Sequence, residues 1–150
     1  GFITTTCLSD HKADDRTLWL CQQRVYWRRI LDDLTSGATE PTPLTNVPLS
    51  MACPNYSSQF AARVGKALSH CAHLLQTLLQ ECAPLPESFD PTGHPLCMTT
   101  LQHMQSCPEL ASMAFFWHQL CQHYQGRGPR FLQAVRLLHA HILRWAKSFD

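Results

Sequence analysis

Apolar residues recur along much of this chain at intervals of three and four positions, which places them on one face of an α-helix. The clearest stripe lies between residues 57 and 82: Phe60, Val64, Leu68, Cys71, Leu75, Leu78 and Cys82. The longest stretch that resembles a strand is the N-terminal "FITTTCL". The pattern therefore predicts an all-α protein.

The second half of the chain predicts two more helices and a short helical turn. A last helix from Pro129 to about residue 149 has its own stripe: Phe131, Val135, Leu138, Ile142, Trp145 or Ala146, and Phe149. Before it, residues 108–125 open on Pro108, which suits the first turn of a helix, and a short turn over 98–106 precedes them. The link "GRG" is so short that we expect the last two helices to pair antiparallel.

Residues 14–35 form a different kind of helix. One side carries Leu20, Trp27, Ile30, Leu31 and Leu34, and the nearly opposite side carries Leu18, Cys21 and Val25. A helix that is apolar on two sides is usually buried between neighbours. We therefore expect this helix, Trp27 included, to lie inside the protein.

Proline-rich stretches over residues 37–55 and 83–96 cannot continue a helix. With 45% hydrophobic residues among 150, we expect residues 1–150 to form a single domain, a compact four- to five-helix bundle with long proline-rich connections. The charged fraction is 15%, against about a quarter in typical soluble domains. Because of this and of Gly1 at the start, we expect a domain excised from a larger protein.

The stretch "SHCAHLLQTLLQEC" at residues 69–82 raises the question of a metal site. Cys71 falls on the apolar stripe, whereas His70 and His73 point more than about 100° away from its centre. One metal ion is therefore hard to reach from this helix. We expect Cys71 to be a buried thiol and both histidines to be solvated.

A weaker zinc hypothesis combines His103 with Cys107 and His118 with Cys121, because each pair has helical spacing and four such ligands make a tetrahedral set. Pro108 interrupts the set, and the chain has no Cys-x-x-Cys pair. We expect neither a metal ion nor another cofactor.

The eight cysteines leave the redox state open. Three lie in the middle of predicted helices, where reduced thiols serve as packing: Cys21, Cys71 and Cys121. Cys82 and Cys97 bracket one loop and could close it as a disulfide, and Asn55–Ser57 matches the N-glycosylation pattern. We favour an intracellular protein of the cytoplasm or nucleus, with a secreted protein as the alternative.

Motifs of common enzyme sites are missing from the sequence. It contains no glycine-rich phosphate loop, no Gly-x-Ser-x-Gly and no His-Glu-x-x-His. The adjacent carboxylates at 14–15 and 32–33 point about 100° apart on a helix and do not form an acid–base pair. Nothing local activates one cysteine over another. We expect that the protein is not an enzyme.

Other features suggest a protein partner. Phe115 and Leu137 fall off the apolar stripes, and Arg136, Arg144 and Lys147 share one helix face in a region without acidic residues. These five residues are our predicted partner-binding residues. The alternatives are a solvated basic face, and a loop or the N-terminal segment covering the two apolar residues. "VYWRRI" adds two arginines beside Trp27, a combination frequent in binding hot spots.

The net charge of +1 gives no reason to expect nucleic acid, and no apolar run is long enough to span a bilayer. We interpret the chain as a helical protein–protein interaction module of a larger regulatory or scaffolding protein, with a viral parent as one option. Its partner would be another protein or other domains of the same chain. The alternative is a secreted, disulfide-stabilised, cytokine-like bundle that binds a cell-surface receptor.

Overall fold

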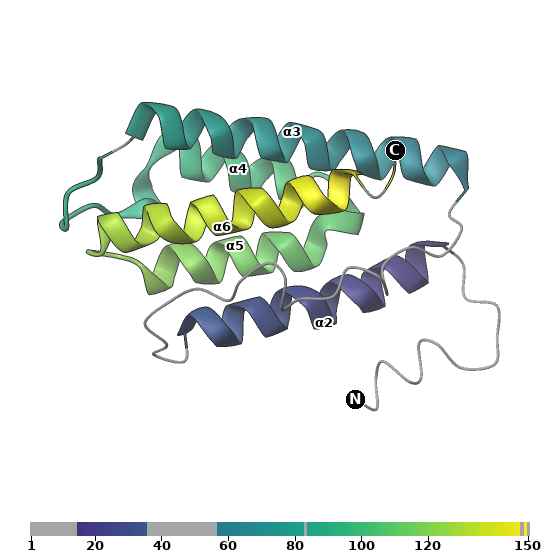
Figure 1. Ribbon diagram of the computed structural model, residues 1–150, viewed down its shortest axis with the longest axis horizontal. Helices are drawn as coiled ribbons and strands as arrows, with labels where there is room; N and C mark the ends of the chain where they lie inside the picture. The colour runs from purple at the N-terminus through teal and green to yellow at the C-terminus, as the bar shows by residue number, and fades with distance from the viewer. Residues whose placement is uncertain (1–14, 36–56, 83, 148, 150) are drawn as a thin grey trace.

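Five α-helices make up most of the chain that the computed structural model describes, namely residues 15–35, 57–82, 84–147 and 149 (Figure 1). They are α2 (Asp15–Thr35), α3 (Ser58–Cys82), α4 (Pro95–Gln105), α5 (Ala111–His123) and α6 (Gly128–Lys147). Two short 3₁₀ helices, η3 (Pro91–Gly93) and η4 (Pro108–Leu110), precede α4 and α5. These ranges contain no strand, and the all-α prediction is confirmed.

Several predictions fall on other parts of the chain. The "FITTTCL" segment, the proline-rich stretch over residues 37–55 and Asn55 of the glycosylation pattern lie outside the described residues. In the ranges that are described, no helix combines the length and the apolar character needed to cross a bilayer.

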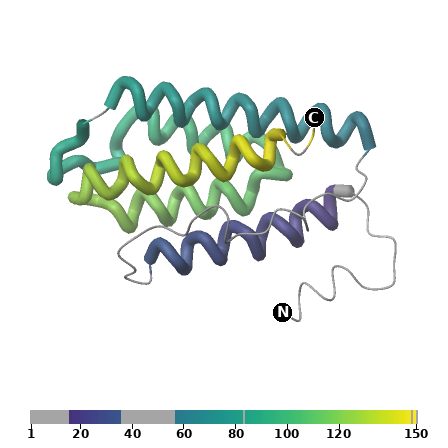
Figure 2. The backbone as a smooth tube through the Cα atoms, in the orientation of Figure 1, coloured from purple at the N-terminus to yellow at the C-terminus, as the bar shows by residue number. Residues whose placement is uncertain are grey.

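The helices pack with their axes roughly aligned, as the tube view shows (Figure 2). Helix α6 packs chiefly on α3, α2 packs chiefly on α5, and α4 contacts both α3 and α5. Helices α2, α3 and α5 run in one direction, and α4 and α6 run in the other (Figure 1). The predicted antiparallel arrangement of the last two helices is confirmed.

The largest correction to the sequence analysis concerns α4. We expected a short turn over 98–106, and the structure has an 11-residue helix that starts at Pro95. Its start is explained by two local features. Pro95 takes the first helical position, and the Nδ1 atom of His94 accepts a hydrogen bond of 3.1 Å from the backbone N–H of Leu96. Proline has no N–H that could remain unpaired at the helix start, and the His94 imidazole pairs the N–H of Leu96.

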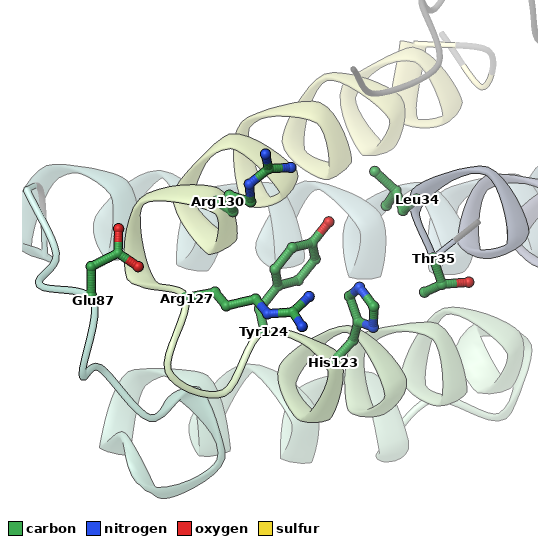
Figure 3. Close-up of a pocket in the computed structure, with 7 residues that line it drawn as sticks. All are labelled: Leu34, Thr35, Glu87, His123, Tyr124, Arg127 and Arg130. Carbon is green, nitrogen blue, oxygen red and sulfur yellow. The ribbon is translucent and has the colours of Figure 1, made fainter. Parts of the chain in front are cut away.

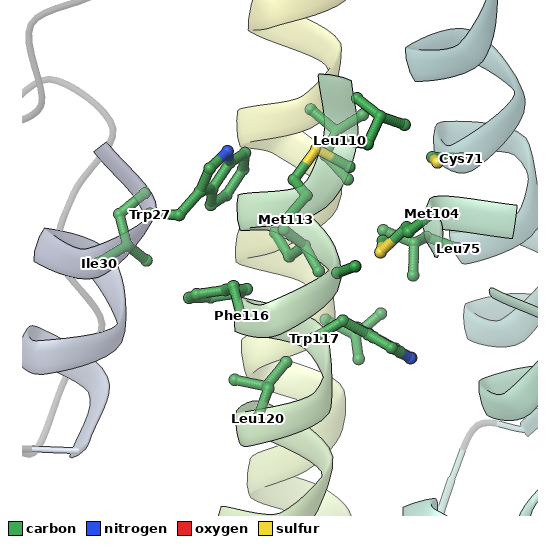
Figure 4. Close-up of a cluster of buried hydrophobic side chains, with 14 of the residues drawn as sticks. Trp27, Ile30, Cys71, Leu75, Met104, Leu110, Met113, Phe116, Trp117 and Leu120 are labelled. Carbon is green, nitrogen blue, oxygen red and sulfur yellow. The ribbon is translucent and has the colours of Figure 1, made fainter. Parts of the chain in front are cut away.

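The predicted stripes of α3 and α6 form one apolar seam. Val64, Leu68 and Leu75 of α3 are fully buried, as are Val135 and Ile142 of α6. Figure 4 shows how the core continues past this seam, with α5 between α2 and the cysteine- and leucine-bearing face of α3. Each such aliphatic side chain contributes about 1.5–3 kcal/mol on burial, and the seam is therefore a main source of stability.

Helix α2 is buried mainly on one side. Trp27 is buried as predicted, and so is Cys21 on the second apolar side. Leu18 is only half-buried, and Val25 is 44% exposed. The prediction of a helix enclosed on two sides is therefore wrong for Val25, because α5 covers one face of α2.

Polar contacts connect α2 to the rest of the bundle at its N-terminal end. The indole N–H of Trp19 donates a hydrogen bond of 2.7 Å to the backbone oxygen of Glu109. The carboxylate of Glu109 is itself buried and lies 2.8 Å from the Arg63 guanidinium and 3.7 Å from Nε of Arg16. One buried carboxylate thus joins α2, α3 and η4.

A second polar contact lies near the middle of α2. The Tyr26 hydroxyl and Nδ1 of His141 are 2.5 Å apart, and both side chains are buried. Burial, with a smaller effect of Arg144, lowers the pKa of His141 to about 4. Its imidazole is therefore neutral at pH 7. Beside it, the indole N–H of Trp27 donates a hydrogen bond of 2.6 Å to Oε1 of Gln23.

Candidate functional site

A groove of about 380 Å³ lies between α2 and α5. Its apolar floor comes from Trp27 and Leu31 of α2 and from Phe116 of α5, all of them buried. The rings of Trp27 and Phe116 are tilted against each other with centroids 5.3 Å apart. Phe115 lines the groove and is 57% exposed, which makes it the most exposed of the large apolar side chains that the structure describes.

Local sequence explains why the groove forms here. The four α2 residues that line it, Arg24, Trp27, Arg28 and Leu31, follow the i, i+3, i+4, i+7 spacing of one helix face. The α5 side begins with Ala111 and Ser112, whose short side chains leave room next to α2, and continues one turn later with the phenylalanines. Small residues beside large aromatic ones thus produce a hollow with an apolar floor.

The charge around the groove is positive. Arg24 and Arg28 line it, and none of the described residues that line it is acidic. Arg28 is 3.1 Å from Asp32 one turn along the helix, but both side chains are exposed, and such surface pairs contribute little. Arg24 forms no ion pair with the residues that the structure describes. The groove can therefore receive an apolar side chain from a segment that also has Asp or Glu residues next to that side chain.

The predicted partner-binding residues divide into two groups. Phe115 lies in the groove. The other four lie on α6, where Arg136 and Lys147 are exposed, Arg144 is half-buried, and Leu137 is half-buried against the core. None of these four lines the groove.

No pattern in the sequence marked Arg24 or Leu31 as groove residues, although both line the groove. The signal for the site was "VYWRRI", since Trp27 and Arg28 both line the groove. Trp27 does so as a core residue, since its side chain is buried.

The alternative zinc ligands are not brought together. His103 lies against His70 of α3, with ring centroids 4.0 Å apart, whereas His118 is exposed on α5. Cys121 is buried next to Cys97, and a side-chain hydrogen bond between them raises the pKa of the Cys121 thiol. Among the described residues, no three His, Cys, Asp or Glu side chains are placed to hold a metal ion.

The two predictions about "SHCAHLLQTLLQEC" are confirmed. Cys71 is 0% exposed, and His70 and His73 are both exposed. Burial raises the pKa of Cys71 to about 12, and the side chain is therefore a protonated thiol at neutral pH. Cys71 packs as a small apolar residue.

The structure bears on two points about disulfides. Cys21, expected as a reduced packing thiol, is disulfide-bonded, and that prediction is wrong. Cys82 and Cys97, which bracket one loop and could have closed it as a disulfide, are both free. The reason is their surroundings: the Cys82 sulfur lies 3.6 Å from Nε2 of His94, while Cys97 is buried and faces Cys121.

Comparisons of the chain with protein-family models, with curated proteins and with solved structures find no match.

Proposed function

We propose that this protein is a helical interaction module, part of a larger regulatory or scaffolding protein, whose α2–α5 groove receives an acidic amphipathic helix. This helix belongs to another protein or to another domain of the same chain. The observation that carries the proposal is Phe115, which is 57% exposed at an apolar groove flanked by Arg24 and Arg28. The proposed activity is binding, without a chemical reaction.

The residue types in the groove suit a binding hot spot. Aromatic and arginine side chains dominate the energy of protein interfaces, and they do so where a pocket excludes water. Phe115 still exposes more than half of its surface, and its burial under a partner would contribute about 25 cal/mol for each Å² of apolar area removed from water. An amphipathic helix presents apolar residues at i, i+3 and i+4 to such a groove.

The positive charge beside the groove favours some amphipathic partner helices over others. Arg24 and Arg28 lie on the α2 side of the groove, and its lining includes no carboxylate from the part of the chain that the structure describes. A partner helix with Asp or Glu beside its apolar stripe would gain charge-assisted hydrogen bonds there, whereas a basic helix would be repelled. Because these guanidinium groups are exposed, salt screens them over about 8 Å at physiological ionic strength. Binding should therefore weaken as salt rises.

The proposal can be tested without knowledge of the natural partner. A library of 16-residue peptides displayed on phage is selected on the wild-type protein and, in parallel, on Phe115→Asp and Met98→Asp. Met98 is the matched control, because it is 48% exposed and lies on α4, away from the groove. We expect acidic amphipathic peptides from the wild type and from Met98→Asp, and none from Phe115→Asp.

Two results of the selection would overturn the proposal. One is enrichment of the same peptides on Phe115→Asp, which would place the binding surface elsewhere. The other is enrichment of basic peptides, which would contradict the role of Arg24 and Arg28. A melting temperature of Phe115→Asp close to that of the wild type establishes that the variant is folded.

One observation favours a second candidate function, a secreted factor that binds a receptor. The disulfide at Cys21 suits an oxidising compartment, where such bonds persist. A count of free thiols in denaturant, without reductant, on protein from its natural source separates the two candidates. Eight free thiols favour the intracellular module, and a disulfide that includes Cys21 favours the secreted factor.

A further inference from the structure

A second cavity, of about 430 Å³, lies at the turn that joins α5 to α6. Its polar lining is concentrated in a few residues: Thr35 at the end of α2, His123 and Tyr124 at the end of α5, Arg127 in the turn, Arg130 at the start of α6, and Glu87 from the loop before α4. This cavity is separate from the α2–α5 groove and has a different chemistry.

Two glycines hold the turn in a fixed position. Gly126 has φ of +71°, a conformation that other residues rarely adopt, and its N–H donates a hydrogen bond of 2.9 Å to the backbone oxygen of Phe89. At Gly128, a Cβ atom would lie only 2.0 Å from the backbone oxygen of Pro86. A side chain at position 128 would therefore clash with the loop over 86–89, and one at position 126 would strain the backbone.

Arg127 lies between these glycines, with its backbone held on both sides. Its N–H donates a hydrogen bond of 3.0 Å to the oxygen of Tyr124, and its own carbonyl accepts one of 2.9 Å from Phe131. The guanidinium group is thus attached to a rigid backbone, which lowers the entropy lost when it binds a ligand. Figure 3 shows Arg127 and His123 directed into the same space beside the Tyr124 ring.

The cavity holds more positive than negative charge. Neither Arg127 nor Arg130 forms an ion pair with the carboxylates that the structure describes. Glu87 is the one acidic residue among the described residues that line the cavity, and it forms no ion pair with either guanidinium group. Burial and the charge of Arg127 lower the pKa of His123, and burial raises the pKa of Tyr124. At pH 7 both rings are therefore neutral and can donate hydrogen bonds.

We propose that this cavity binds a phosphate monoester carried by a small molecule. Two guanidinium groups, an imidazole and the hydroxyl of Tyr124 are all hydrogen-bond donors, and a phosphate dianion offers three acceptor oxygens to such a set. The hydroxyl of Thr35 is not counted here, because it donates its hydrogen bond to the backbone oxygen of Leu31. Guanidinium groups match phosphate geometry with two parallel hydrogen bonds. The volume lies in the range of small-molecule sites, and it leaves room for the organic part of the ligand.

The test uses two probes, inorganic phosphate and phenyl phosphate, titrated at pH 7.5 and constant ionic strength into the full chain. Binding is followed by NMR through the backbone amides and the His123 ring. We expect saturable binding of both probes, tighter for phenyl phosphate, and a rise in the pKa of His123 in the complex, because a nearby anion favours the imidazolium. A merely structural role of these residues would not move this pKa.

Single substitutions with a matched control locate the site. Arg127→Ala and Arg130→Ala should each weaken binding at least tenfold, since charge-assisted hydrogen bonds are lost. Arg136→Ala, which removes the same charge from an exposed position of α6 outside the cavity, should change affinity less than twofold. Glu87→Gln should strengthen binding a few-fold because a negative charge leaves the cavity.

Three results would overturn the proposal. The first is no saturable binding of either probe, and the second is an affinity for acetate equal to that for phosphate. The third is a loss of affinity in Arg136→Ala as large as in Arg127→Ala, which would reveal only a general attraction of anions to α6. Should Arg127→Ala fail to fold, Arg127→Lys decides instead. It keeps the charge but loses the two-pronged hydrogen bonding, and we expect a several-fold loss of affinity with the fold intact. Unchanged affinity in Arg127→Lys would also contradict the proposal.

Discussion

The seam between α3 and α6 and the seam between α2 and α5 hold the same bundle together in different ways. The α3–α6 seam is a continuous apolar contact of aliphatic and aromatic side chains. The α2–α5 side also has a buried aromatic floor, but α2 reaches the rest of the bundle through buried polar contacts as well: Trp19 with Glu109, and Tyr26 with His141. The candidate groove opens on this second side.

The difference suggests a division between stability and recognition. Apolar contacts gain free energy in proportion to the area buried and do not depend on pH. Buried polar contacts add little net stability, but they are costly to break and they fix one arrangement of the helices. A helix held in a fixed register by such contacts is a suitable support for a binding groove, because the groove keeps its shape when it is empty.

The largest expected effect lies on the apolar seam. Leu75 of α3 is fully buried, and Leu75→Ala should lower the free energy of unfolding by about 4 kcal/mol through lost contacts and the cavity left behind. Urea unfolding followed by circular dichroism measures this. A loss of less than about 1 kcal/mol would mean that the seam is not the main source of stability.

The next effect is a pH dependence on the α2 side. The pKa of His141 is about 4 in the folded protein, against an ordinary histidine value of 6.5 for the unfolded chain. Because the folded value is the lower one, the stability from neutral His141 is fully present above pH 6.5 and is lost as the pH falls towards 4. The total is about 3 kcal/mol.

Urea unfolding at pH 7 and at pH 4.5 tests this in three proteins. We expect His141→Gln to lose much of the wild-type pH dependence, and His73→Gln, at an exposed position of α3, to keep it. The same pH dependence in His141→Gln and the wild type would show that other groups are responsible.

A smaller effect is expected where Arg63 meets Glu109. Arg63→Met leaves the buried carboxylate of Glu109 with the longer contact to Arg16 and a weak hydrogen bond from the Cys107 thiol, and we expect a loss of about 2 kcal/mol in the free energy of unfolding. The double variant Arg63→Met with Glu109→Gln removes the stranded charge, and its stability should lie above that of Arg63→Met alone. If the double variant is the less stable of the two, the cost does not come from the buried charge.

The smallest effect on stability is expected in the groove. Phe115 is largely exposed, and Phe115→Asp should change the free energy of unfolding by less than about 0.5 kcal/mol. Thermal unfolding measures this. A loss of several kcal/mol would make Phe115 part of the core and remove the main support for the groove as a binding site.

The α3–α6 seam was predictable from the sequence to a greater extent than the α2 side of the bundle. The stripes of α3 and α6 follow helical spacing closely, so burial of Leu75 and Ile142 was predictable from spacing alone. Helix α2 was harder, because its apolar residues lie on two sides and spacing does not say which side a neighbour covers. The 44% exposure of Val25 and the disulfide at Cys21 depend on the neighbours of α2.

The groove between α2 and α5 was predicted only in part, because the spacing of residues describes one helix at a time. Phe115 was recognised because it falls off its helix stripe, and that property is local to α5. Arg24 and Leu31 line the groove only because α2 packs on α5, and no local pattern indicates which helices pair. The cavity at the α5–α6 turn likewise combines residues from α2, α5, α6 and a loop.

The most direct test of the groove places a photoreactive benzoylphenylalanine at position 115 or, as the control, at position 98. Each protein is mixed with a synthetic helical peptide that has Leu at i, i+3 and i+4 and Glu beside them, then irradiated, and the crosslinked products are identified by mass spectrometry. We predict crosslinking at position 115, a marked decrease when Arg24→Glu is added, and little at position 98. Equal crosslinking at both positions, or crosslinking at position 98 alone, would contradict binding in the α2–α5 groove.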